Sequence, residues 1–231
     1  MSDKVFLITG ASSGIGAATA RAASRAGYRL VLAARSEDKL AALAAECGGD
    51  DRALPVVTDV TSWEDNERLA AAALDAFGQI DVAFVNAGFG GKRSFKPDEA
   101  DTVEHWRDMV LTNVLGCAYT IRATIDAVKE TTGHMLLTGS VAGRVALPGS
   151  LYSSTKWAVT GMGQSLRGEL AGSGVRVTLI EPGAVDTPFF DNRPQAALVA
   201  QDIANAVMYA VSQPPHVDVS EILVRPTQQA M

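Results

Sequence analysis

The chain has 231 residues, 47% of them hydrophobic and 20% charged, and this composition excludes a disordered chain and supplies a large core. Its formal net charge of −6 and its lack of a basic run argue against nucleic acid or an anionic membrane surface as a partner. No apolar run approaches the roughly 18 residues of a membrane span. The histidines show no ligand spacing, so we expect no metal site.

Two features of the sequence bear on location. Met1–Lys4 leads straight into an apolar run, without the regions of a signal peptide. Cys47 and Cys117 lie far apart in helix-like stretches, which is typical of buried free thiols in a reducing compartment. We therefore expect a cytoplasmic protein.

Short apolar runs, read as strands, alternate with helical stretches along the whole chain. Helix boundaries are marked by caps such as Ser36 and Ser62 and by glycines such as Gly27 and Gly78. The alternation predicts a single α/β domain over residues 1–231, a Rossmann-like, doubly wound parallel sheet with helices on both faces. The expected strands are Val5–Thr9, Leu30–Ala34, Leu54–Thr58, Ile80–Val85, Met135–Thr138, Val175–Ile180 and Ile222–Val224. Three expected helices end at Arg25, Cys47 and Gly78. Three more cover Thr102–Lys129, the stretch opened by Tyr152, and Gln201–Ser212.

The first strand ends in a glycine-rich turn, Gly10-Ala11-Ser12-Ser13-Gly14-Ile15-Gly16. A strand, a glycine turn and a helix place backbone N–H groups and a helix N-terminus against a phosphate. The spacing Gly-x-x-x-Gly-x-Gly differs from the usual Gly-x-Gly-x-x-Gly. A tight turn with close helix–strand packing would also require glycines, but the position directly after the first strand favours phosphate binding.

A second pattern combines Ser140 with Tyr152 and Lys156. If a helix opens here, the four-residue spacing stacks Tyr152 and Lys156 on one face. A phenol has a pKa of about 10, and a neighbouring ammonium is expected to draw that pKa down. Ser140 follows the expected strand Met135–Thr138, so all three side chains can converge at the carboxyl end of the sheet, where open α/β sheets bind ligands.

With these residues in place, the chain resembles the short-chain dehydrogenase/reductases from Lys4 to about Pro226. The markers of that family occur in their usual order: the glycine turn, Asp59-Val60, Asn86-Ala87-Gly88, Asn113, Ser140, Tyr152 with Lys156, and Pro182-Gly183 followed by Thr187. The spacing from Ser140 to Tyr152 is one residue shorter than is common, and Val85 stands where many members have a second Asn.

The resemblance implies an oxidoreductase that interconverts an alcohol and a carbonyl by hydride transfer. Tyr152 would exchange a proton with the substrate oxygen, Ser140 would hydrogen-bond the carbonyl, and Lys156 would hold the nicotinamide ribose and lower the pKa of Tyr152. Asn113 would steady a water in a proton relay. The catalytic residues implied are Asn113, Ser140, Tyr152 and Lys156.

The resemblance also implies a nicotinamide dinucleotide site. Asp59 would accept a hydrogen bond from the adenine, Asn86 would help place the adenosine ribose, and Thr187 would contact the carboxamide and phosphates. The cofactor-binding residues expected are Gly10, Ser12, Ser13, Gly14, Ile15, Gly16, Arg35, Asp59, Val60, Asn86, Ala87, Gly88, Tyr152, Lys156, Pro182, Gly183, Val185 and Thr187.

The end of the second strand bears on which dinucleotide binds. An NAD enzyme usually carries an acid there to bind both ribose hydroxyls. Here Ala34 is followed by Arg35, with no acid, which predicts NADP(H). Many NADP-using relatives have a basic residue where Ser13 stands, so Arg35 is expected to be the main cation.

The substrate site is expected among residues near the chemistry: Phe89, Arg144, Val145, Leu147, Ala184, Phe189 and Phe190. The segment from Thr187 to Gln201 is short for a lid, which predicts an open, apolar pocket for small to medium carbonyl compounds. An anionic substrate held by Arg144 or Arg93 is the alternative.

Two further expectations concern assembly and class. Small and apolar residues on several faces of the Thr102–Lys129 and Tyr152 helices, such as Val114 and Met162, predict a homo-oligomer, a tetramer or a dimer. A catalytically silent NADP(H) sensor or scaffold on the same fold is the alternative to an enzyme. Such proteins typically lose the tyrosine or the lysine, and this chain has both.

Overall fold

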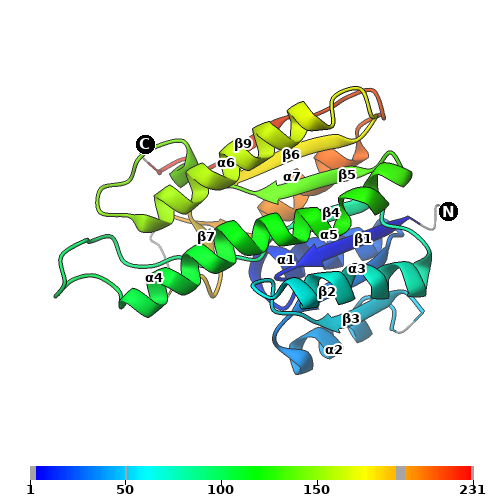
Figure 1. Cartoon of the computed structure of the whole chain (residues 1–231), viewed down its shortest axis with the longest axis horizontal. Helices are drawn as coiled ribbons and strands as arrows, with labels where there is room; N and C mark the ends of the chain where they lie inside the picture. The colour runs from blue at the N-terminus through cyan, green and yellow to red at the C-terminus, as the bar shows by residue number, and fades with distance from the viewer. Residues whose placement is uncertain (1–3, 50, 191–195, 230–231) are drawn as a thin grey trace.

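A computed structural model describes residues 4–49, 51–190 and 196–229. Its centre is a seven-stranded sheet in which every pairing is parallel (Figure 1). The strands lie across the sheet in the order β3 (Ala53–Val57), β2 (Arg29–Ala34), β1 (Val5–Thr9), β4 (Val82–Val85), β5 (His134–Thr138), β6 (Arg176–Pro182) and β9 (Glu221–Val224).

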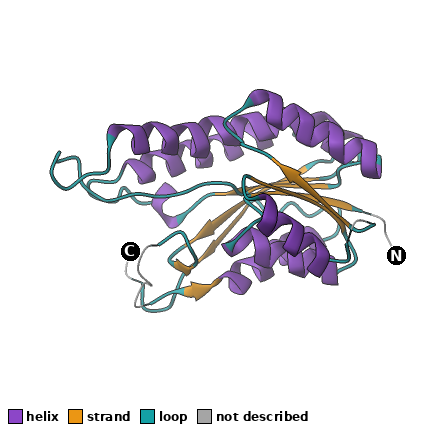
Figure 2. Cartoon of the chain, turned by 90° about the horizontal axis from the view of Figure 1, so that it is seen from below, coloured by secondary structure: helices purple, strands orange, loops and turns teal. Residues whose placement is uncertain are grey.

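Helices cover both faces of this sheet, which confirms the Rossmann-like, doubly wound fold (Figure 2). One face packs against α1 (Gly14–Arg25), α2 (Glu37–Glu46) and α7 (Ala200–Ser212), and the other against α3 (Trp63–Phe77), α5 (Cys117–Glu130) and α6 (Leu151–Glu169). Within the described residues, no helix is long and apolar enough to cross a membrane.

The strands are apolar on both sides because both faces are buried. In β1, Phe6 and Ile8 join the core beneath α1, α2 and α7, whereas Val5 and Leu7 join the core on the opposite face. All four side chains are fully buried. At about 25 cal/mol per Å² of apolar surface removed from water, these two layers supply the main stabilisation of the fold.

Local signals in the sequence set the helix boundaries. The Ser62 side chain accepts a hydrogen bond from the backbone N–H of Asp65 and caps α3, which ends at Gly78 with φ 76°. Ser150 caps α6 in the same way, so the helix begins at Leu151 and places Tyr152 in its first turn. Glycine tolerates the left-handed conformation that a helix end often requires.

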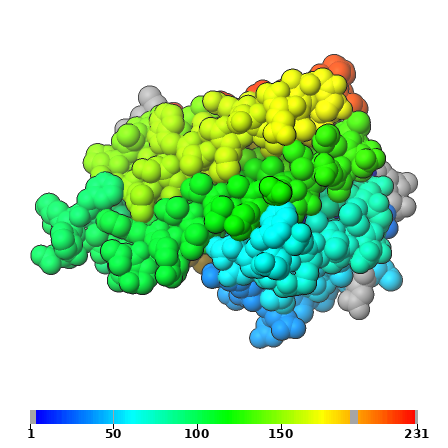
Figure 3. Space-filling model, in the orientation of Figure 1, coloured from blue at the N-terminus to red at the C-terminus, as the bar shows by residue number. Residues whose placement is uncertain are grey.

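The expected helix over Thr102–Lys129 is interrupted. It consists of α4 (Val103–Val110), a π-helical turn (Leu111–Gly116) and α5. In the space-filling view these green segments lie beside the yellow-green α6 (Figure 3). A small parallel ladder between β7 (Val185–Asp186) and β8 (Leu198–Val199) was not expected from the sequence.

The order of the strands reverses between the neighbouring strands β1 and β4. The chain first builds β2 and β3 on one side of β1 and then crosses to build β4, β5 and β6 on the other. Ligands of open α/β sheets bind outside the carboxyl ends of the strands at such a point. A cavity of about 700 Å³ lies here.

Candidate active site

The glycine turn after β1 has the close packing that a dinucleotide cradle requires. Gly10 and Gly14 adopt φ of 65° and 52°, which side-chain-bearing residues rarely adopt. A Cβ on Gly16 would overlap the carbonyl oxygen of Gly10, so only glycine lets α1 start this close to the turn. Gly16 does not line the cavity itself, whereas Gly10 and Gly14 do.

The start of α1 leaves donors available to a phosphate. Ser13 is the N-cap residue, and its side chain makes no capping hydrogen bond. The first turn of α1 carries no acidic side chain. Its backbone N–H groups and positive dipole end therefore border a cavity that Ser12, Ser13 and Ile15 also line.

Beyond the turn, the cavity reaches the ends of β2 and β3. Ala34, Arg35 and Asp59 line this part. Arg35 is exposed and, among the described residues, makes no ion pair. The Asp59 carboxylate oxygen Oδ1 accepts hydrogen bonds from the backbone N–H and the hydroxyl of Thr61, at 2.9 and 2.8 Å.

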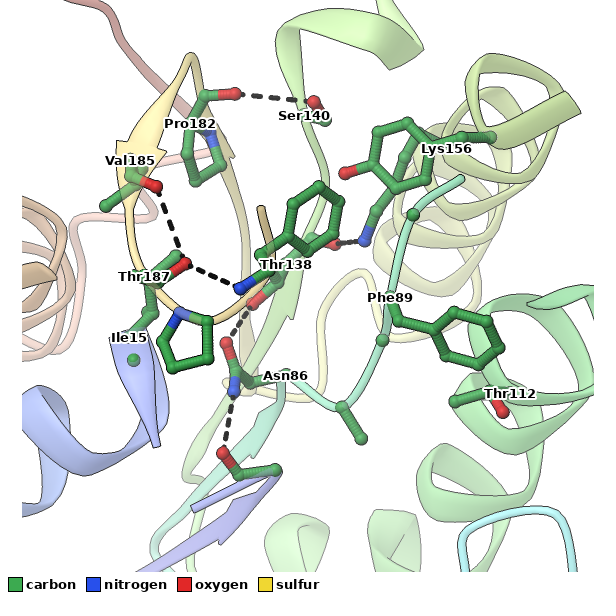
Figure 4. Close-up of a pocket in the computed structure, with 18 of the residues that line it drawn as sticks. Ile15, Asn86, Phe89, Thr112, Thr138, Ser140, Lys156, Pro182, Val185 and Thr187 are labelled. Atoms are coloured by element: carbon green, nitrogen blue, oxygen red, sulfur yellow. Dashed lines mark hydrogen bonds between the residues drawn. The ribbon is translucent and has the colours of Figure 1, made fainter. Parts of the chain in front are cut away.

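Asn86, after β4, joins three strands at their carboxyl ends. Its side-chain Nδ2 donates to the carbonyl oxygen of Thr9 at 3.0 Å. Its Oδ1 accepts from the Thr138 hydroxyl at 3.0 Å (Figure 4). These bonds fix the wall that continues through Ala87 and Gly88 into the cavity. The glycine turn and Asn86-Ala87-Gly88 thus form one continuous lining.

Ser140, Tyr152 and Lys156 border the same cavity. Lys156 is 4% exposed; its Nζ donates to the carbonyl oxygen of Thr138 at 2.7 Å and lies 5.7 Å from the centre of the Tyr152 ring. The Ser140 hydroxyl accepts from the backbone N–H of Ala142 and donates to the carbonyl oxygen of Pro182, at 3.1 and 3.3 Å. Figure 4 shows Ser140 directed toward Pro182.

Burial decides the ionisation of the two central groups. Burial raises the pKa of Tyr152 to about 12, and a hydrogen bond with Ser140 opposes that rise. Burial also lowers the pKa of Lys156 to about 8. Desolvation favours the neutral form of each group. The expected lowering of the Tyr152 pKa by Lys156 is therefore not what this structure shows, and the phenol is protonated at neutral pH.

Asn113 lies in the π-helical turn, behind the cavity lining. Its Nδ2 donates to the carbonyl oxygen of Phe89 and to the Thr155 hydroxyl at 2.8 and 3.1 Å, and its Oδ1 accepts from the backbone N–H of Phe89 at 3.0 Å. A Cβ on Gly88 would lie 3.0 Å from Asn113 Oδ1 and 3.7 Å from Lys156 Nζ, so the amide and the ammonium border the same glycine. The extra residue of a π turn accommodates this buried amide.

Aromatic side chains form much of the remaining lining. The Phe189 ring packs edge-on against Tyr152, with 5.4 Å between ring centres, and against Phe190, with 5.0 Å. A Cβ on Gly90 would overlap the Phe189 ring. Thr187 lies opposite the glycine turn, since a Cβ on Gly14 would come within 3.2 Å of its side chain.

Two residues expected in the substrate site lie outside the cavity lining. Arg144 forms ion pairs with Glu181 at 2.6 Å and Glu221 at 2.5 Å, and Val145 does not border the cavity either. Glu181 is almost fully buried, and an unpaired buried carboxylate is costly, so the guanidinium turns toward it. Their expected role in the substrate site is therefore wrong.

The cavity brings together most of the side chains that the sequence singled out. Those that line it are Gly10, Ser12, Ser13, Gly14, Ile15, Arg35, Asp59, Val60, Asn86, Ala87, Gly88, Phe89, Arg93, Ser140, Leu147, Tyr152, Lys156, Pro182, Gly183, Ala184, Val185, Thr187, Phe189 and Phe190. Asn113 and Gly16 adjoin it.

Sequence reasoning missed several polar lining residues, among them Thr138 and Gln229. Thr138 ends β5, and its carbonyl and hydroxyl bind Lys156 and Asn86; its place at the end of a buried strand was a usable signal. Gln229 lies near the end of the chain, where no pattern pointed to it.

Comparison with known proteins assigns the family. Residues 4–197 match the sequence profile of the short chain dehydrogenases. The chain belongs to the short-chain dehydrogenase family. An uncharacterized oxidoreductase of Staphylococcus haemolyticus is 41% identical over 231 residues, covering 98% of both chains.

Two solved short-chain dehydrogenase-like structures show the same fold. The alcohol dehydrogenase of the archaeon Thermococcus sibiricus, complexed with 5-hydroxy-NADP, is 34% identical with a TM-score of 0.90, covering 99% of this chain and 98% of that one. The 3-ketoacyl-(acyl-carrier-protein) reductase of Brucella melitensis, complexed with NADH, is 28% identical with a TM-score of 0.89, covering 97% and 98%. This short-chain dehydrogenase is therefore an oxidoreductase of a family that binds a nicotinamide cofactor, and its glycine turn fits one.

Proposed function

We propose that this short-chain dehydrogenase interconverts an alcohol and an aldehyde or ketone with NADP(H), with Tyr152 as the general acid and base. The observation that carries the proposal is that Ser140, Tyr152 and Lys156 border the same cavity as the glycine turn. The nicotinamide supplies or accepts the hydride when it is bound. The protein supplies orientation and the proton.

Each residue has a distinct task in this proposal. The Ser140 hydroxyl donates to the substrate carbonyl oxygen in place of Pro182 and so orients the carbonyl. Tyr152, protonated at neutral pH, gives its proton to that oxygen during reduction and takes it back during oxidation. Lys156 holds the ribose hydroxyls and, with Asn113 and a water, returns a proton to Tyr152.

Arg35 and the absence of an acid after β2 support NADP(H) over NAD(H). A charge-assisted hydrogen bond contributes about 1.5–3 kcal/mol, so loss of the 2′-phosphate should weaken affinity roughly 10- to 150-fold. The Thermococcus sibiricus relative carries an NADP derivative, whereas the Brucella melitensis relative carries NADH. Ala34→Asp should reverse the preference by repelling the phosphate. Equal affinities of the parent protein for the two cofactors would contradict the proposal.

The experiment that tests the activity is NADPH oxidation against a panel of aldehydes, ketones, keto acids and semialdehydes. Turnover of at least one carbonyl compound, abolished by Tyr152→Phe, is the expected result. Tight NADPH binding without turnover of any compound would favour the silent sensor or scaffold instead. The presence of both Tyr152 and Lys156 at the cavity supports an enzyme over a silent sensor or scaffold.

The lining supports a small to medium carbonyl substrate of apolar or aromatic character. Phe89, Leu147, Phe189 and Phe190 supply apolar surface, and each methylene in such a pocket changes specificity by only about 1–3 kcal/mol. Because Arg144 is paired with two carboxylates, the alternative of an anionic substrate rests on Arg93. A keto acid preferred over its methyl ester by more than about a hundredfold in kcat/KM, roughly 2.7 kcal/mol, would favour that alternative.

Assembly and location complete the proposal. Val103, Val110, Leu115 and Trp157 expose apolar surface on α4, the π-helical turn and α6, which supports a homo-oligomer, a tetramer or a dimer. The buried free thiols of Cys47 and Cys117 fit the cytoplasm.

A further inference from the structure

The end of the chain folds back over the turn that follows β6. The backbone N–H of Gly183 donates to the carbonyl oxygen of Val224 at 2.7 Å, which extends the pairing of β6 with β9. The tail then turns, with the backbone N–H of Gln229 donating to the carbonyl oxygen of Pro226 at 3.0 Å. Parallel pairing thus carries Gln229, which is distant in sequence from Tyr152, to the carboxyl end of the sheet.

The Gln229 side chain is fixed at that end. Its Oε1 accepts a hydrogen bond from the backbone N–H of Ala184 at 2.9 Å, and a Cβ on Gly183 would overlap the same oxygen. The carbonyl of Ala184 is also bound, to the backbone N–H of Leu198 at 2.9 Å. Both backbone groups of Ala184 are therefore used, and the carboxamide is held by a rigid partner.

The nitrogen of this carboxamide is available to a ligand. Gln229 is half-buried and lines the cavity together with Ala184 and Ser140. Its Nε2 makes no hydrogen bond to any described residue. This nitrogen is not one of the fully buried atoms without a partner, so it is accessible from the cavity or solvent. With Oε1 occupied by Ala184, Nε2 offers two N–H donors.

Gln229 stands close to the carbonyl-binding end of the site. The Ser140 hydroxyl contacts the carbonyl oxygen of Pro182, two residues before the alanine that binds Gln229. The surrounding lining is mostly apolar, with Leu147, Phe189 and Phe190. A fixed donor in an apolar wall discriminates strongly between ligands with and without a matching acceptor, because a ligand without one leaves the donor unpaired.

We propose that Gln229 is a substrate-binding residue that selects carbonyl compounds with a second neutral hydrogen-bond acceptor beside the reacting carbonyl, such as diketones and hydroxyketones. The inference rests on the proposed carbonyl reduction and names its substrate class. Ser140 and Tyr152 hold the reacting oxygen, and the Gln229 carboxamide donates to the second oxygen.

The test compares ethyl phenyl ketone with methyl phenyl diketone, which differ in the second oxygen. Gln229→Glu keeps an acceptor for the Ala184 N–H and loses the donor, whereas Gln229→Met is similar in size and loses both. Because each variant is compared with the parent on the same compound, the intrinsic reactivity of the two ketones cancels. Gln228→Glu adds the same charge at the neighbouring exposed residue and serves as the control.

In both Gln229 variants, kcat/KM for the diketone should fall about five- to tenfold further than kcat/KM for the monoketone, the loss expected for one neutral hydrogen bond. NADPH affinity, measured by fluorescence titration, should change less than about threefold, and Gln228→Glu should behave as the parent. Equal losses for the two ketones, or no loss for the diketone, would overturn the inference, as would a fall in NADPH affinity that accounts for the loss. A parent protein that reduces other carbonyl compounds but not the diketone would overturn the inference alone. One that reduces no compound of the panel would overturn the proposed function, and the inference with it.

Discussion

At the scale of single residues, burial governs the chemistry of Tyr152 and Lys156. The pKa of Tyr152 rises to about 12 and that of Lys156 falls to about 8, because desolvation favours the neutral form of the half-buried phenol and of the buried amine. Near neutral pH the phenol is a proton donor, and the lysine still carries its proton in most molecules. In the proposed function, this protonated phenol is the group that gives a proton to the carbonyl oxygen during reduction.

Tyr152→Phe should lower kcat for carbonyl reduction by a factor of about 10² to 10⁴, the range of general acid catalysis. The ring keeps its edge-on packing with Phe189 and loses only the transferable proton. NADPH affinity should change little, as measured by fluorescence titration beside steady-state kinetics. Lys156→Ala is the comparison variant and should weaken both kcat and NADPH binding. A Phe variant that keeps more than about a tenth of the parent rate would contradict the role of Tyr152.

His134 in β5 should make stability depend on pH. Burial, reinforced by the charge of Arg176, lowers the pKa of this imidazole from 6.5 to about 3. The folded-state pKa lies below the unfolded one, so the stabilisation is complete above about pH 6.5 and is lost as pH falls toward 3. Between pH 8 and pH 5 this residue alone should cost about 2 kcal/mol of unfolding free energy.

Urea denaturation at a series of pH values measures this effect. His134→Gln has no imidazole to protonate, so its unfolding free energy should vary less over the same pH range. Its absolute stability is not the readout, because the substitution also changes the hydrogen bond of 2.7 Å between His134 Nε2 and the Thr178 hydroxyl. Identical pH slopes for the two proteins would exclude His134 as the cause.

At the scale of elements, the segment after β6 and the loop after β4 meet over Tyr152. Phe189, from the first, packs against Gly90, from the second, where a Cβ would overlap its ring. The position of the aromatic ring therefore depends on a residue almost a hundred positions away. The same ring packs edge-on against Tyr152.

Gly90→Ala should displace the Phe189 ring and change the fit of aromatic substrates. We expect kcat/KM for an aromatic ketone to change about tenfold, most of it in KM, since the displaced ring alters apolar contacts worth about 1–3 kcal/mol. Steady-state kinetics with an aromatic and a small aliphatic ketone would measure the change. Gly168→Ala in α6 is the control, because a Cβ there meets nothing within 4 Å. Indistinguishable kinetics for the two variants would show that Phe189 does not shape the site.

At the scale of the whole molecule, α4, the π-helical turn and α6 expose several large apolar side chains. Val103 is 69% exposed and Trp157 47% exposed, and Val110 and Leu115 add to the same set of elements. Large contiguous apolar surfaces are rare on monomers. The net charge of −6 is not concentrated on α6, whose only acidic residue is Glu169.

Trp157→Glu should dissociate the proposed homo-oligomer, since a carboxylate in an apolar interface is costly. Light scattering at micromolar concentration should give a multiple of 24.2 kDa for the parent and a smaller mass for the variant. Leu74→Glu, on the exposed side of α3, is the matched control and should leave the mass unchanged. A parent protein of monomeric mass would refute the association itself.

The sequence by itself determined the doubly wound sheet. Its strands are continuous apolar runs, its helix ends are marked by residues such as Ser62 and Gly78, and both kinds of signal are local. It also predicted most of the side chains that meet at the cavity, because the carboxyl ends of parallel strands share one edge of the sheet. Ser140 after β5 and Tyr152 in the first turn of α6 follow from that order alone.

The tertiary structure alone decided the features that depend on partners distant in sequence or on burial. Arg144 turns away from the cavity because Glu181 and Glu221 lie on neighbouring strands. The π-helical turn forms where Asn113 meets Phe89, and Gln229 reaches the cavity through the pairing of β9 with β6. The pKa of Tyr152 rises because folding partly removes it from water. This desolvation is set by the packing of the whole chain around the phenol, which no local pattern contains.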